Sequence, residues 1–215
     1  MNIISNGINN TLQIQRQTEQ QRTAKVNKKE IDNKTVNNLA SKLEEAQDGI
    51  GAVEILLKAA KDGEIEQLSG NNFKSGNYYI LNLFKFDAVP FAANMKMISD
   101  LNLGIAPEQI TVIQKDNEYF IVSKIEGCES GNLIPFQQVK TKLSKENKLA
   151  AYKDLQKLTR AGIADAKVLR STVSWYVTPD NNRVVIPVWE SLYPLNSNLE
   201  RNQAMEKYYK MLFSE

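Results

Sequence analysis

Aromatic residues are absent from the first part of this chain: none occurs before Phe73. Aromatic side chains supply a large share of the apolar area that a core buries, so a well-packed core should begin near that point. Residues 1–35 are instead rich in Asn and Gln, and such a segment buries too little apolar surface to offset its ordering entropy. We therefore expect a disordered tail over residues 1–35, a helical extension over 36–63 and a main domain over 64–215.

The composition excludes several classes of chemistry. The 215 residues include no histidine and a single cysteine, Cys128. Ser-His-Asp and Cys-His catalysis, histidine-bound zinc and an internal disulfide are therefore impossible within one chain. Any chemistry must use carboxylates, lysines, hydroxyls or a bound divalent ion. Cys128 follows Gly127 in a chain without histidine, so we expect it to be a passive residue of the hinge rather than a nucleophile.

Charge and hydropathy limit the partners. The 27 basic and 25 acidic side chains nearly balance, and no dense basic stripe is present, so we expect no nucleic-acid binding. No apolar run approaches the roughly 20 residues that a membrane-spanning helix needs. We therefore expect no integral membrane segment. The N-terminus also lacks the basic-then-apolar pattern of a cleaved signal peptide.

Hydrophobic periodicity predicts a mixture of helices and strands. Val36, Leu39 and Leu43 are spaced for one helical face, and residues 52–63 form a second helix that ends at Gly63. Strand-like segments follow at 64–70 and 77–87. The remaining predicted elements are a helix over 88–104 that buries Ala93, Met97 and Leu101, a hairpin over 110–127, a helix over 144–161 that starts at Ser144 and buries Leu149, Tyr152, Leu155 and Leu158, a hairpin over 174–192 that turns at residues 179–182, and a C-terminal helix.

The order of these elements resembles a protein kinase reduced to its minimum, over roughly residues 64–192. "LSGNNFKSGNYYILNLFKF" is similar to the glycine-rich loop and the strand that bears the ATP-anchoring lysine, and "YFIVSKIEG" to the hinge strand. "YKDLQKLTRAGIADAK" resembles the helix that leads into the catalytic loop, and "VVIPVWESL" lies where the metal-binding strand is expected. The resemblance implies an α+β, two-lobed kinase-like fold that binds ATP and Mg²⁺.

The same resemblance assigns two catalytic residues. Asp165 matches the carboxylate that orients the attacking hydroxyl, and Lys167 would neutralise charge on the transferred phosphate. The simpler alternative is that Asp165 accepts hydrogen bonds from amides of the loop that follows the helix. The sequence leaves both roles open.

The nucleotide and metal positions depart from the family pattern. Gly70 represents the glycine loop, and the ATP lysine aligns with Asn82, or with Lys85 after a shift of register. The second metal ligand, an Asn in the family, aligns with Arg170 at strict spacing, or with Ser174 if the loop is longer. The metal-binding Asp aligns with Val188, so Glu190 or Asp180 would have to replace it, although Asp180 is also a typical turn residue.

Two functions therefore compete. One is an atypical active kinase that transfers phosphate from ATP to a protein hydroxyl. The other is a pseudokinase, a kinase-like fold that acts as a binding module after losing its metal chemistry. A triphosphate without a metal-binding Asp lacks the ion that neutralises it, which favours the second.

The opening Met-Asn-Ile-Ile-Ser-Asn is similar to export signals of type III secreted bacterial effectors. This resemblance implies delivery into the host-cell cytoplasm, a host protein as target (in one group of minimal effector kinases, a heat-shock chaperone), and a secretion chaperone that binds the tail. An ordinary disordered tail, or a regulator that stays in the bacterium, fits the composition too.

Overall fold

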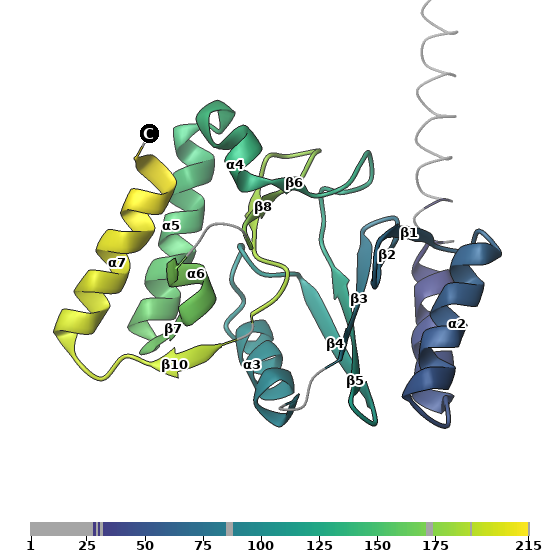
Figure 1. Cartoon of the computed structure of the whole chain (residues 1–215). Helices are drawn as coiled ribbons and strands as arrows, with labels where there is room; N and C mark the ends of the chain where they lie inside the picture. Colours follow the sequence, from purple (N-terminus) through teal and green to yellow (C-terminus); the bar gives the residue numbers. More distant parts are fainter. Residues whose placement is uncertain are drawn as a thin grey trace, which may run out of the picture.

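A computed structural model of the chain describes residues 28, 30, 32–84, 88–170, 174–189 and 191–214. Helices and strands form a sheet lobe and a helical lobe, with the N-terminal helices on the outer side of the sheet (Figure 1). In chain order, the elements after the first helix are α2 (Gly49–Lys61), β1 (Glu66–Ser69), β2 (Asn72–Ser75), β3 (Tyr78–Phe84), α3 (Ala88–Asp100), β4 (Gln109–Lys115), β5 (Glu118–Lys124), β6 (Ile134–Pro135), α4 (Phe136–Val139), the 3-10 turn η1 (Lys140–Lys142), α5 (Lys145–Arg160), β7 (Ile163–Asp165), α6 (Ala166–Arg170), β8 (Tyr176–Val177), β9 (Val184–Val185), β10 (Leu192–Pro194) and α7 (Asn198–Phe213).

The first helix is continuous over residues 32–45, so it crosses the expected boundary between tail and extension at residue 35. Its buried face is formed by Val36, Leu39 and Leu43, as the periodicity predicts. Residues 1–27, where the disordered tail and export signal are expected, lie outside the described residues.

Capping and a tertiary contact position α2. The helix begins at Gly49, earlier than predicted, because the Asp48 side chain accepts a hydrogen bond from the Gly51 amide at 2.7 Å. The Gly49 amide also donates to the Asp116 carboxylate at 2.9 Å, in the β4–β5 turn. The start of α2 is thereby fixed to the end of the sheet hairpin.

The sheet is antiparallel and has the strand order β1-β2-β3-β5-β4. β2 is a separate strand within the segment that the sequence treated as a glycine loop. Gly70 and Gly76, in the turns on either side of β2, have φ values of +50° and +53°. Glycine adopts this left-handed conformation without the steric cost that a side chain incurs.

Each face of the sheet packs against a different core. The outer core joins Phe73, Ile80 and Phe120 to the helix over 32–45 and to α2. On the inner face, Leu81 and Leu83 pack against the larger core, which continues into α3, α5 and α7. The alternation of side chains along β3 therefore separates an outer face from an inner face that looks toward the helical lobe.

The buried face predicted for α3 is only partly correct. Leu101 packs against the larger core as predicted, but Ala93 and Met97 are exposed, and Met95 and Ile98 are fully buried instead. Met95 and Ile98 are three positions apart, a spacing that also places residues on one face of a helix. The face they form is shifted by one to two positions from the predicted one. Periodicity alone could not choose between these faces because Met occurs on both.

The helical lobe follows the predicted order. α5 starts at Ser144, whose hydroxyl accepts a hydrogen bond from the Asn147 amide at 3.1 Å. Its buried side holds Leu155 and Leu158 as predicted, whereas Leu149 is exposed. Both tryptophans, Trp175 and Trp189, are completely buried in the larger core, as expected for core residues.

Polar contacts join the two lobes. Arg183, in the helical lobe, forms an ion pair with Glu108 and donates to the Gly104 carbonyl at 3.0 Å, both in the connection from α3 to β4. The Ile186 amide donates to the Ile105 carbonyl at 2.7 Å in the same region. The lobes are therefore connected by a shared apolar core and by direct hydrogen bonds.

The predicted α+β, two-lobed class is confirmed, and the described helices and strands follow one another in the expected order. In the part of the chain that the structure describes, no helix has both the length and the apolar character needed to cross a membrane.

Candidate functional site

The inner face of β3 is apolar where the family resemblance requires a charge. Kinases hold the nucleotide phosphates with a lysine on this strand. Here the inner positions are Tyr79, Leu81 and Leu83, and the two leucines belong to the interlobe packing. Within the described part of β3, no cation faces the helical lobe.

Asn82, which aligns with the ATP lysine, lies on the opposite face. Its side chain is buried and its Nδ2 donates to Glu118 Oε2 at 2.7 Å. Strand alternation directs it toward the outer core, away from any ligand between the lobes. This position does not fit the predicted nucleotide contact. Lys85, the alternative, lies outside the described residues.

Asp165 is fully buried at the end of β7, and its carboxylate is occupied by backbone amides. Oδ1 accepts from the Lys167 amide at 2.7 Å and from the Val168 amide at 3.1 Å, which caps the short helix α6. Oδ2 accepts from the Ser191 amide at 3.2 Å, next to the residue that pairs with Asp165 in β10. The carboxylate thus joins three backbone segments, as the alternative interpretation of this residue expects.

Several predicted site residues are not brought together. Lys167 is an exposed residue of α6. Gly70 is an exposed residue of the β1–β2 turn, and its carbonyl accepts from Gln67 Nε2 at 2.8 Å. Glu190 lies outside the described residues. Val188, at the metal position, packs against the larger core. Among the described residues, no group of three or more His, Cys, Asp or Glu side chains is placed to hold a metal ion.

Asp180 acts in the β8–β9 turn as the sequence alternative expects, and it also makes a tertiary contact. Its carboxylate accepts hydrogen bonds from the Ser130 hydroxyl and from the Ser130 amide, the latter at 3.2 Å. These hydrogen bonds hold the pKa of the Asp180 carboxyl below its ordinary value. The contact connects the turn to the segment that follows β5.

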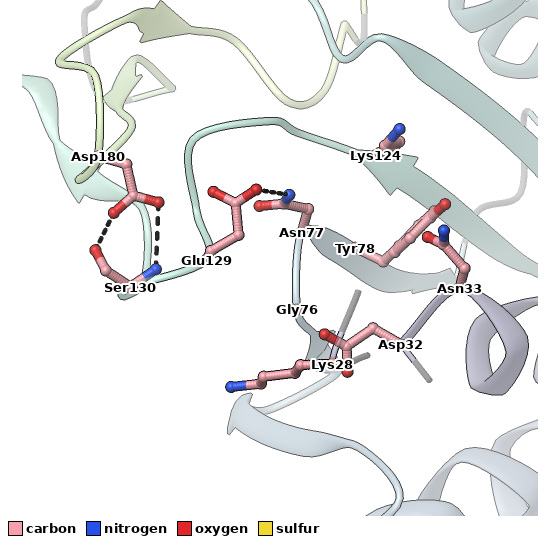
Figure 2. Close-up of a pocket in the computed structure, with 10 residues that line it drawn as sticks. All are labelled: Lys28, Asp32, Asn33, Gly76, Asn77, Tyr78, Lys124, Glu129, Ser130 and Asp180. Carbon is pink, nitrogen blue, oxygen red and sulfur yellow. Dashed lines mark hydrogen bonds between the residues drawn. The ribbon is translucent and has the colours of Figure 1, made fainter. Parts of the chain in front are cut away.

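A cavity of about 610 Å³ opens beside this contact (Figure 2). Four segments converge on it: the start of the first helix, the β2–β3 turn, the loop after β5, and the β8–β9 turn. Glu129 in its wall accepts a hydrogen bond from Asn77 Nδ2 at 2.7 Å. The lining residues are Lys28, Asp32, Asn33, Gly76, Asn77, Tyr78, Lys124, Glu129, Ser130 and Asp180. We call this cavity the junction pocket.

Sequence reasoning did not find the junction pocket. Lys28, Asp32 and Asn33 fall in the segment assigned to the disordered tail, and no motif relates them to residues of the main domain. The one local signal is the glycine at position 76: a Cβ there would lie 2.2 Å from Asp32 Oδ2. A glycine is therefore needed for the first helix to approach the β2–β3 turn this closely.

A buried polar cluster lies on the inner face of the sheet near the hinge segment. Lys74 Nζ donates to the Gly131 carbonyl at 2.6 Å and lies 5.8 Å from the centre of the Tyr79 ring. Burial lowers the pKa of Lys74 and raises the pKa of the Cys128 thiol to about 11. Cys128 is thus a protonated, buried thiol, in agreement with the passive role expected from the sequence.

Comparisons with known proteins identify a similar solved structure. No family model matches the chain, and no curated protein matches it. The chain is similar to the structure of the Cydia pomonella granulovirus kinase PK-1, with a TM-score of 0.47 and 12% sequence identity, over 75% of this chain and 73% of the viral one.

Proposed function

We propose that this chain is a pseudokinase-type binding module, which uses a kinase-like fold to bind a partner protein without transferring phosphate. The observation that carries the proposal is the environment of Asp165. Its carboxylate is fully buried and accepts three backbone hydrogen bonds, which leaves it engaged in the fold rather than directed at a substrate hydroxyl.

The other positions support the same conclusion. Phosphoryl transfer needs a cation at the phosphates and a carboxylate-bound Mg²⁺. Leu81 and Leu83 occupy the inner face of β3, and Val188 occupies the metal position. α3, whose family counterpart pairs a Glu with the lysine, has no acidic residue before Asp100.

The junction pocket is the proposed binding surface. It lies where the first helix, both lobes and the connecting loop meet, so an occupant would contact all of them. Its charged side chains are of both signs, with Lys28 and Lys124 beside Asp32, Glu129 and Asp180. Such a wall is suited to a polar protein segment, which can form hydrogen bonds and ion pairs of either sign.

Radiolabelled ATP tests the catalytic question. We expect no label on the protein, or on proteins of a host lysate, after incubation of the full chain with ATP and Mg²⁺. Label transfer that disappears in Asp165→Asn while that variant stays folded would establish the competing proposal, an active kinase that uses Asp165 with Lys85 and either Glu190 or Asp180.

We also propose, from the sequence of residues 1–35, that the chain is a type III secreted effector whose partner is a host protein, with a heat-shock chaperone as the first candidate. Residues 1–35 fused to a reporter should be exported only by bacteria with an intact type III apparatus. Removal of residues 2–27 should abolish export and leave the melting midpoint unchanged. Export of the shortened chain would contradict this proposal.

A further inference from the structure

A second cavity, of about 530 Å³, lies on the helical lobe between α6, β10 and α7. It is separate from the junction pocket and from the inner face of the sheet. Its lining residues are Ala166, Leu169, Arg170, Ser191, Leu192, Tyr193 and Lys207. We call it the α6–α7 pocket.

The charge of the α6–α7 pocket is positive. Arg170 and Lys207 are the ionisable cations in its wall, and no Asp or Glu occurs among the described residues that line it. Neither cation forms a hydrogen bond or an ion pair with another described residue. Arg170 and Lys207 are thus available to a ligand.

Two described carboxylates that act electrostatically on Tyr193 are already engaged. Asp165, behind the pocket, accepts its three backbone hydrogen bonds. Glu200, which acts electrostatically on Tyr193, accepts hydrogen bonds from the Asn196 and Ser197 amides in the capping box of α7. These acids stabilise backbone donors, so they are not positioned as direct counter-ions for the two cations.

The rest of the wall is apolar or carries hydroxyl donors. Ala166, Leu169 and Leu192 supply apolar surface, and Ser191 and Tyr193 supply hydroxyl groups. A guanidinium, an ammonium and hydroxyl donors together suit an oxyanion with several acceptor oxygens, and the guanidinium fork matches phosphate geometry. The apolar wall suits an organic group attached to that oxyanion.

We propose that the α6–α7 pocket binds a phosphate monoester carried on an aromatic group, namely a phosphorylated tyrosine side chain of the partner protein. The proposal deepens the binding-module function and rests on it for the identity of the partner. The phosphate contacts Arg170 and Lys207, and the ring packs between Leu169 and Leu192. A small aromatic phosphate shares this chemistry, so the two sources are separated by experiment.

Calorimetric titration of the full chain tests the proposal with three probes: phenyl phosphate, inorganic phosphate, and a capped pentapeptide with a central phosphotyrosine between glycines. We expect the peptide and phenyl phosphate to bind more tightly than inorganic phosphate. Arg170→Gln and Lys207→Gln should each weaken both aromatic probes about tenfold or more, as the loss of a charge-assisted hydrogen bond implies. Lys210→Gln is the matched control, because Lys210 lies on the same helix and pairs with Glu206 outside the pocket.

Three results would overturn the proposal: no binding of phenyl phosphate, equal binding of inorganic phosphate, or unchanged binding in the Arg170→Gln, Lys207→Gln double variant. Binding of phenyl phosphate without the peptide would overturn the protein partner. A salt titration of the parent chain gives an independent readout, because affinity for an anion held by two cations must fall as ionic strength rises. If the probes do not bind the α6–α7 pocket, the proposal that the chain is a binding module still stands. If the chain transfers label from ATP, the binding-module proposal is wrong, and the result of these titrations is unchanged.

Discussion

Replacement of Asp165 by Ala tests whether the carboxylate of this residue stabilises the fold. Hydrogen bonds to a charged group contribute about 1.5–3 kcal/mol each. Asp165 accepts three of them while fully buried, and a buried donor left without its partner costs about 1–3 kcal/mol. Because Asp165→Ala leaves three backbone amides without their acceptor, we expect it to lower the free energy of unfolding by about 3–5 kcal/mol. A typical domain has about 5–15 kcal/mol in total.

Asp165→Asn gives a graded comparison. The remaining oxygen still accepts from the Lys167 and Val168 amides, but the new amide group faces the Ser191 amide donor, so we expect a loss of about 1–3 kcal/mol. Urea unfolding followed by the fluorescence of the two buried tryptophans measures both variants. Asp100→Ala, an exposed acid at the end of α3, should change stability by less than about 0.5 kcal/mol. If Asp165→Ala unfolds at the same urea concentration as the parent, the structural role is refuted.

Three further predictions concern the contact of the first helix with the β2–β3 turn, the polar contacts between the lobes, and the pKa of the Cys128 thiol. Gly76→Ala should destabilise the chain by about 1 kcal/mol more than Gly70→Ala: both positions share the left-handed φ cost, and only the Cβ at 76 meets Asp32. Equal losses in urea would show that the first helix does not sit on the β2–β3 turn. Arg183→Met should cost about 1–3 kcal/mol by removing the polar contacts between the lobes, and a neutral effect would contradict that connection. Because burial raises the pKa of Cys128 from 9.0 to about 11, the folded state retains this proton at higher pH than the unfolded state. The stabilisation is complete below about pH 9 and is lost as pH rises through about 11, so stability should fall more steeply there in the parent than in Cys128→Ala, and parallel curves would contradict the shift.

Much of the fold could be predicted from the sequence because its signals are local. The hairpin over 110–127 has alternating apolar residues and a polar turn, and α5 combines a Ser cap with regular apolar spacing. β2 was not separated because its four residues lie between two glycines, too short a run for periodicity. The buried face of α3 was misplaced because Met95 and Met97 satisfy the pattern about equally well.

The candidate site was less predictable because it depends on which face a side chain takes. Side chains alternate along a strand, so Asn82 and Leu83 must lie on opposite faces of β3, but alternation does not decide which face looks toward the helical lobe. The outer face is the one that α2 and the first helix cover, and their contacts with the sheet join residues distant in sequence. The pairing of Asp165 with three amides likewise depends on β10 returning to β7, a contact that no local pattern encodes.

Binding of ATP with Mg²⁺ to the full chain, followed by calorimetry, tests the central claim most directly. The account predicts no heat of binding at millimolar nucleotide, because the inner face of β3 is apolar and Asp165 is held by backbone amides. A saturable heat that requires Mg²⁺ would contradict it, since a metal-dependent nucleotide site would then exist between the lobes.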